Sequence, residues 1–344
     1  MEPRPPPALA GIAVSPSTDL ELSRYSPAYR RRLADSFEHF RDWIRQHSAG
    51  GEAQLLRPTA KRMDGLLAAY TQHCFDHNVN FSIPKHAALA AQQIYHLRQK
   101  LPRAWNCLWS WKHRLPTQHR LPIPLDFVRA AFTVALNMAF SHRDGGLYLA
   151  LAVLIRIGFY GLLRPSEMYN LRAGDVLVRN SPDGLIAVVV LREPKNRRSL
   201  GSQQFATLRD SSTVRLLAWL IEGLHADHRL WPSTPTRFRT IFAEVMQNCG
   251  LGHLKASPGC LRPGGATHLF LEGVEVSRLQ FLGRWVSVSS LNHYIQESMS
   301  LLVWIRLDNA ERLRLEATCR IGLPFWSTPP SLPLAAFAHL LPSS

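Results

Sequence analysis

The sequence contains few cysteines, and none of them is spaced like the ligands of a zinc knuckle. Their number is odd, which fits neither a closed disulfide framework nor a four-cysteine metal site. A reducing intracellular compartment is therefore expected. The five cysteines are Cys74, Cys107, Cys249, Cys260 and Cys319.

Long apolar runs free of charge are also lacking. The longest apolar stretch, Gly145 to Leu163, carries Arg156 within it. This stretch is more typical of a buried core helix than of a membrane span. The first residues are rich in proline and do not show the charged start and apolar run of a secretory signal, so none is expected.

Acidic residues are scarce relative to basic ones. The 344 residues include 40 Lys and Arg but only 25 Asp and Glu, which gives a net charge of +15. Such a charge attracts polyanions, so it favours nucleic acid or an anionic membrane surface as a partner without choosing between them. The hydrophobic share of 46% can fill a sizeable core, and the length favours two domains.

Most of the chain shows helical periodicity. Apolar residues recur three or four positions apart from Tyr29 to Ile44, and a stiff Leu121-Pro-Ile-Pro124 segment separates this half from a new apolar helix. The sequence predicts a disordered N-terminal arm at 1–25, a helical domain at 26–121, a second domain at 122–322 and a Pro-rich tail at 323–344.

The second domain also contains strand-like segments. Asp175 to Arg179 and Leu185 to Leu191 flank a turn sequence that ends at Gly184, and Gln204 to Leu208 forms a third segment. The predicted fold class is therefore α+β, mainly α with a small antiparallel β-sheet.

Tryptophans interleave with basic residues near the end of the first domain. Trp105 and Trp109 precede Lys112, a mixture that can line a DNA groove. Their helical spacing is more often that of core residues, so we expect both to be buried.

Two arginines stand in similar local settings. Arg164 precedes Pro165 and Arg262 precedes Pro263, and proline is favoured at the first position of a helix. Each arginine is thus expected at a helix entrance, where backbone N–H groups and the helix dipole attract phosphate. Two such guanidinium groups can clamp one phosphate, although either arginine alone more often forms a structural ion pair at a helix entrance.

The surroundings of these arginines resemble the tyrosine recombinases, the phage-integrase family. From Gly161 to Asp175 the chain is similar to the family's first arginine box, with Arg164, Glu167, Leu171 and Asp175 at the family's spacing. The segment from Cys260 to Gly273 resembles the second box around Arg262. A third match is Leu282-Gly-Arg-Trp285 followed by Tyr294, nine residues after the tryptophan.

The resemblance implies a core-binding domain at 26–121 and a catalytic domain at 122–322. It also implies a DNA strand transferase that cleaves and rejoins strands through a 3′-phosphotyrosine, without metal or other cofactor, in DNA recombination or integration by a mobile element. The implied partner is double-stranded DNA, bound by a homotetramer, in the nucleus of a eukaryote or the cytoplasm and nucleoid of a prokaryote.

The resemblance assigns Tyr294 as nucleophile, Arg164 and Arg262 as the phosphate clamp, Trp285 as a hydrogen-bond donor and Lys195 as general acid. Basic residues outside these positions are expected to contact DNA, with Arg284 adding positive charge beside Trp285. These are Arg30, Arg31, Arg32, Arg197, Arg198 and Arg284.

One position departs from the family pattern. Gly259 stands where the family usually has a histidine, and glycine offers no side chain for acid–base work. Two alternatives to an active recombinase therefore stay open: a non-catalytic or weakly active DNA-binding relative, and a type IB topoisomerase-like enzyme. Leu301, Leu302, Ile305 and Leu313 are candidates for a subunit contact, or for internal packing.

Overall fold

The computed structural model describes residues 25–115 and 121–328, apart from 183, 193 and 296. Most of the predicted arm at 1–25 and of the predicted tail at 323–344 lies outside the described residues. Contacts between Cα atoms divide the chain into two units, Met1–Gln118 and His119–Ser344, hereafter unit 1 and unit 2.

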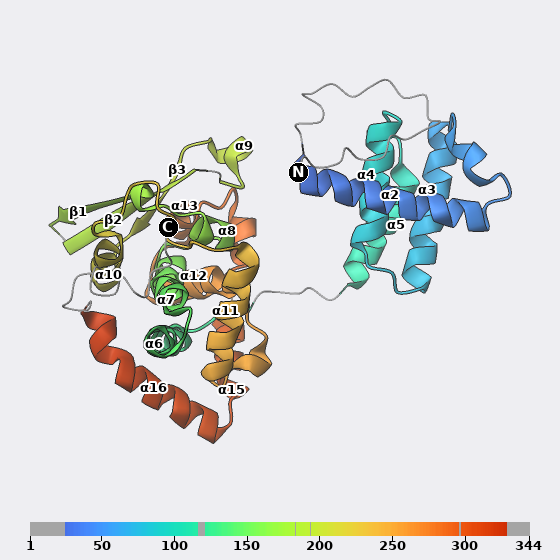
Figure 1. The fold of residues 1–344 in the computed structure, drawn as a ribbon. Helices are drawn as coiled ribbons and strands as arrows, with labels where there is room; N and C mark the ends of the chain where they lie inside the picture. The colour runs from blue at the N-terminus through green and yellow to red at the C-terminus, as the bar shows by residue number, and fades with distance from the viewer. Residues whose placement is uncertain (1–24, 116–120, 183, 193, 296, 329–344) are drawn as a thin grey trace. The chain divides into compact units, whose positions relative to one another are not determined.

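Unit 1 is a helical bundle in which α2 packs against α4 and α3 packs against α5 (Figure 1). The side chains of Ser26 and Thr59 cap α2 and α3 by accepting from backbone N–H groups. One apolar face of α2, including Phe37 and Phe40, is buried in the core. The helices are α2 Pro27–His47, α3 Ala60–Asp76, α4 Ser82–Ile94 and α5 Pro102–Arg114, with the 3-10 turn η1 at Gly51–Leu55.

The tryptophans of α5 are placed differently from the expectation. Trp109 is 65% exposed, Trp105 is half-buried, and Trp111 supplies the core contact instead. Trp111 meets Phe75 and Phe81 edge to face, which fixes the side of α5 that turns inward. The prediction that Trp109 is a core residue is therefore wrong.

Unit 2 is built around α7, which Figure 1 shows among α6, α10 and α12. Every residue of α7 from Tyr148 to Phe159 is buried, including Arg156. The Arg156 guanidinium donates to Thr213, Ser212 and Asp210 and to the Trp326 carbonyl, so its charge is paired. The apolar run of the sequence is thus a core helix, and no described helix is long and apolar enough to cross a membrane.

The sheet of unit 2 has three antiparallel strands in the order β1-β2-β3, as predicted. Val176 pairs with Val189, and Ala187 pairs with Leu208, so alternate residues of β2 face the core. The strands are β1 Val176–Ser181, β2 Gly184–Leu191 and β3 Gln204–Leu208, with the short helix α9 Arg197–Leu200 between β2 and β3.

The remaining helices surround α7 or cap its ends. Helix α16 packs on α6 and continues through Leu323 and Pro324 to Ser327, so helix occupies the start of the predicted tail. These elements are α6 Leu125–Ser141, α7 Gly145–Tyr160, α8 Pro165–Tyr169, η2 Ala173–Asp175, α10 Ser211–Ile221, α11 Pro235–Asn248, η3 Gly252–Leu254, η4 Pro258–Cys260, α12 Leu261–Leu271, α13 Val276–Gly283, α14 Val288–Asn292, α15 Glu297–Ile305 and α16 Asn309–Ser327.

Candidate active site

Arg164 occupies the N-cap position of α8, with Pro165 at the first helical position, as the sequence predicts. Its Nη1 donates to Glu167 Oε1 at 2.7 Å, and its backbone N–H donates to Oε2 of the same carboxylate at 2.8 Å. Glu167 therefore caps the helix and holds the Arg164 side chain. The Glu167 side chain is only 4% exposed, so this is a buried pairing.

Arg262 lies inside the first turn of α12 rather than at its entrance, because the helix already begins at Leu261. Its guanidinium is buried and donates to two backbone carbonyls, Leu162 O at 2.7 Å and Gly283 O. Leu162 follows α7 with a φ of 50°, a left-handed conformation that is uncommon for leucine. These bonds fix Arg262 between the end of α7 and the end of α13.

Arg284, one of the predicted DNA contacts, is buried, with only 6% of its surface exposed. It ends α13 in the left-handed conformation and points its side chain inward. Its Nη2 donates to Glu167 Oε2 at 3.0 Å and to Leu162 O at 3.1 Å. Arg284 thus shares its acceptors with Arg164 and Arg262, and the structure assigns it to their cluster.

The resulting arginine cluster comprises Arg164, Arg262, Arg284 and the single carboxylate Glu167. Burial, together with the positive charges of Arg164 and Arg284, lowers the pKa of Arg262. Burial would raise the pKa of Glu167, but Arg284 and Arg164 outweigh it and hold that pKa below its ordinary value. Among the described residues, three guanidinium groups face one carboxylate, which leaves an excess of positive charge that an anion would balance.

Tyr294 and Trp285 pack over this cluster. The guanidinium carbon of Arg262 lies 4.4 Å from the Trp285 ring centroid and 5.6 Å from that of Tyr294. The two aromatic ring centroids are 5.1 Å apart. The Thr267 hydroxyl on α12 donates to the Tyr294 carbonyl at 3.2 Å, so the half-buried tyrosine is held beside the second arginine box.

Three N–H groups in this cluster are buried without a hydrogen-bond partner among the described residues. They are Arg262 Nε, Arg284 Nε and Trp285 Nε1. Unsatisfied buried donors are rare and costly in folded proteins. Because all three are donors and the surroundings are positive, an acceptor-rich anion is the chemical group that would satisfy them.

Gly283 is required by the close packing of Trp285. A Cβ atom at this position would lie 1.6 Å from a carbon of the Trp285 ring, so any other residue would displace the indole. The Trp285 backbone N–H donates to Gln280 O at 3.0 Å, which holds the tryptophan against the end of α13.

Lys195 is exposed in the loop between β2 and β3. The next residue, Asn196, donates from Nδ2 to Arg284 O at 3.3 Å and so attaches this loop to the arginine cluster. Lys195 is therefore adjacent to a residue that contacts the cluster, and among the described residues it forms no hydrogen bond to the cluster itself. The amide of Asn196 is a positioning group that no sequence motif had indicated.

The other predicted DNA contacts lie on the surface where they are described. Arg30, Arg31 and Arg32 are exposed on α2, and Arg197 is exposed at the start of α9. The Arg198 side chain lies outside the described part of the structure. Gly259 is buried in η4, immediately before α12.

Two histidines near the second box are held elsewhere. His268 packs against Phe159 at a ring distance of 5.5 Å, and burial lowers its pKa. His253 faces Glu311 at 3.5 Å. Neither histidine is described in contact with Tyr294 or Arg262. Neither of the two therefore replaces the histidine that the family usually has at the position of Gly259.

No protein-family model and no curated protein sequence matches the chain. Solved structures do match in fold. The Tn1549 transposon integrase in complex with transposon right-end DNA aligns with a TM-score of 0.51 at 12% identity, over 81% of this chain and 93% of that one.

Two further recombinase structures align less closely. XerH site-specific recombinase bound to difH substrate aligns with a TM-score of 0.45 at 15% identity, over 76% of this chain and 70% of that one. XerA recombinase aligns with a TM-score of 0.39 at 12% identity, over 88% of this chain and 94% of that one. The chain has the fold of the tyrosine recombinases, and the predicted fold class is confirmed.

Proposed function

We propose that this protein is a DNA strand transferase of the tyrosine-recombinase type. Tyr294 attacks a DNA phosphodiester, the 3′-phosphate becomes linked to the phenol oxygen, and the 5′-hydroxyl leaves. The reverse attack by a 5′-hydroxyl from another strand releases the tyrosine and rejoins the DNA. The covalent bond conserves the energy of the phosphodiester between the two steps.

The three unpartnered donors beside Tyr294 carry this proposal. A phosphate beside the stacked Arg262 and Trp285 side chains could accept from their buried N–H groups and would balance the excess positive charge. Positive charge there stabilises the additional negative charge of the transition state. The clamp is fixed before substrate binds, since Arg262 and Arg284 are both anchored to Leu162 O.

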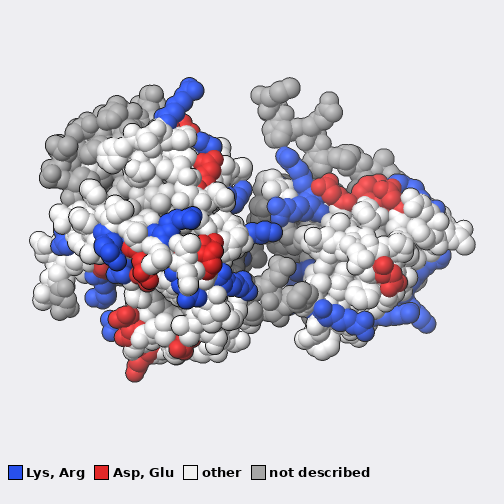
Figure 2. Space-filling view, turned by 90° about the horizontal axis from the view of Figure 1, so that it is seen from below, with Lys and Arg blue, Asp and Glu red and all other residues white. Residues whose placement is uncertain are grey.

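Double-stranded DNA is the proposed partner. One structural match, at a TM-score of 0.51, is an integrase in complex with transposon right-end DNA. Lys and Arg side chains are spread over the visible face of each unit (Figure 2). We assign residues 26–121 to a core-binding domain and 122–322 to the catalytic domain, with Arg30, Arg31, Arg32, Arg197 and Arg198 as contacts to DNA phosphates.

The reaction is tested by trapping its intermediate. The purified chain is incubated with nicked suicide substrates made from DNA that flanks its own coding sequence, and denaturing gels are examined for a covalent protein–DNA adduct. An adduct at the mass of one protein plus one cleaved strand supports the proposal. Salt-sensitive DNA binding without any adduct would overturn strand transfer.

A second function, DNA binding with little or no cleavage, is favoured by Gly259. This buried residue stands at the start of α12 and presents no acid, base or donor. General acid–base help contributes about 10²- to 10⁴-fold to a rate, so its loss leaves a slow enzyme or one that only binds. The trapping experiment separates the two functions directly.

Lys195 is proposed as the general acid that protonates the leaving 5′-oxygen. Lys195→Ala is expected to slow cleavage by about 10²-fold or more. Replacement of the leaving oxygen by sulfur in the substrate should restore the rate, because a thiolate leaves without being protonated. The rate of adduct formation on both substrates measures this.

Arg197→Ala is the matched control for Lys195, since it removes an exposed cation from the same loop. It should weaken binding on both substrates equally. A Lys195 variant that is equally slow with the sulfur substrate would exclude Lys195 as the acid.

We further propose that four protomers assemble on two duplexes through α15 and the start of α16. Ile305 is 68% exposed and Leu313 is 67% exposed, so both apolar side chains are available to a second copy. Leu313→Asp is expected to reduce the tetrameric fraction on DNA about tenfold, measured by mass photometry.

The matched control for Leu313 is Leu177→Asp on β1, which is 62% exposed. It introduces the same charge in place of an equally exposed leucine. Tetramers that persist in the Leu313 variant would rule out this surface as the contact.

A further inference from the structure

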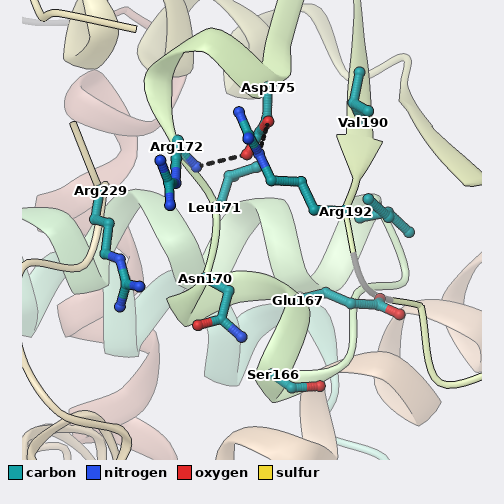
Figure 3. Close-up of a pocket in the computed structure, with 10 residues that line it drawn as sticks. Ser166, Glu167, Asn170, Leu171, Arg172, Asp175, Val190, Arg192 and Arg229 are labelled. Atoms are coloured by element: carbon teal, nitrogen blue, oxygen red, sulfur yellow. Dashed lines mark hydrogen bonds and ion pairs between the residues drawn. The ribbon is translucent and has the colours of Figure 1, made fainter. Parts of the chain in front are cut away.

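A pocket of about 310 Å³ lies beside α8. Figure 3 shows Arg172, Arg192 and Arg229 lining it from three separate segments: the N-cap of η2, the residue after β2 and the loop before α11. We propose that this pocket binds a phosphate group other than the one attacked by Tyr294.

Backbone hydrogen bonds place two of these arginines opposite one another. Arg172 and Arg229 form an isolated antiparallel bridge. Its flanking bonds run from Leu230 N to Leu171 O and from Ala173 N to His228 O, both 2.9 Å, so the arginines are a non-hydrogen-bonded pair. Side chains in such a pair are the closest across two strands, with Cα atoms about 4.5 Å apart. Like charges placed opposite one another are destabilising unless a counter-ion lies between them.

The carboxylates that are described at the pocket, Asp175 and Glu167, are already engaged. Asp175 accepts from the Arg172 backbone N–H at 3.0 Å and from Arg192 Nε at 2.6 Å (Figure 3). The Glu167 carboxylate accepts hydrogen bonds from Arg164 and Arg284 of the arginine cluster. The Arg172 side chain bonds Asp227 at 2.7 Å, but the Asp227 side chain is 68% exposed, so this ion pair contributes little and can be exchanged.

Several donors remain free in the described part of the structure. The Arg229 guanidinium has no hydrogen bond or ion pair there, and Arg192 uses only its Nε. Ser166 and Asn170 also line the pocket, and their side chains have no described partner. A pocket rich in donors and cations, with its carboxylates occupied, selects a compact anion with several acceptor oxygens.

The phosphate can come from the DNA backbone or from solution, and two measurements distinguish these sources. The variant is Arg229→Gln, which removes a charge that supports no described contact. The control is Arg320→Gln, an exposed arginine on α16, which Figure 1 shows at the opposite end of unit 2 from β1 and β2.

The first measurement is the dependence of duplex-DNA affinity on salt, with Tyr294→Phe as the background in every protein. If a DNA phosphate enters the pocket, Arg229→Gln lowers the slope of log K against log[salt] by about 1 relative to the control. The second is thermal unfolding of the full chain in increasing inorganic phosphate at constant ionic strength. If free phosphate binds, its stabilising effect requires at least about tenfold more phosphate in Arg229→Gln.

Either result supports the pocket and identifies the source of its ligand. Equal behaviour of the Arg229 and Arg320 variants in both measurements would overturn it. The DNA source rests on the proposed function, whereas neither readout requires cleavage. An inactive protein can therefore retain the pocket, and an active one can lack it.

Discussion

Tyr294→Phe is expected to lower the rate of covalent adduct formation on the order of 10⁴-fold or more, while DNA affinity and the free energy of unfolding stay unchanged. The substitution removes only the phenol oxygen, which has no hydrogen-bond partner in the described structure. The ring keeps its contacts with Trp285 and Arg262. The change in unfolding free energy should therefore stay within about 0.5 kcal/mol.

The adduct is measured on denaturing gels with a nicked suicide substrate, and DNA affinity is measured by fluorescence anisotropy. Tyr169→Phe is the matched control, because Tyr169 also lies in unit 2 but its ring packs against Phe238 instead of Trp285 and Arg262. An adduct that survives in Tyr294→Phe would assign the attack to another nucleophile, of which the adjacent, exposed His293 is the first to test.

Glu167→Gln is expected to destabilise the protein by about 3–5 kcal/mol, because it removes the only carboxylate described in the arginine cluster and leaves Arg164 and Arg284 without their ion pair. Glutamine retains the size of the side chain, so the loss comes from charge rather than from packing. For unit 2 this corresponds to a fall in Tm on the order of 10 °C. Thermal unfolding of the full chain, followed by circular dichroism, measures it.

The matched control for Glu167 is Glu316→Gln, which neutralises an exposed carboxylate on α16 and should change Tm little. Equal Tm values for the two variants would show that Glu167 contributes no charge pairing.

The same pair has a defined pH dependence. Arg284 and Arg164 hold the pKa of Glu167 below its ordinary value of 4.5. A carboxylate with a lowered pKa contributes stability above its unfolded pKa and loses that contribution as the pH falls through its folded pKa. The difference in Tm between the native chain and Glu167→Gln should therefore be largest near neutral pH and should decrease as the pH falls below 4.5.

The sequence by itself determined the elements whose signals are local. The Arg164-Pro165 start of α8, the core helix α7 and the three strands of the sheet all follow from patterns within a few residues. The order and spacing of Arg164, Arg262, Trp285 and Tyr294 pointed to one fold, and the structure places Arg262, Trp285 and Tyr294 in contact.

Only the tertiary structure decided which charged and aromatic residues turn inward. Arg284 is buried because its left-handed backbone aims it at Leu162 O, 122 residues earlier in the chain. Trp109 is exposed because Trp111 meets Phe75 and Phe81 instead. Arg172 and Arg229 are paired by hydrogen bonds between two distant loops. Local periodicity does not contain such long-range pairings, because burial depends on the surface that the rest of the chain presents.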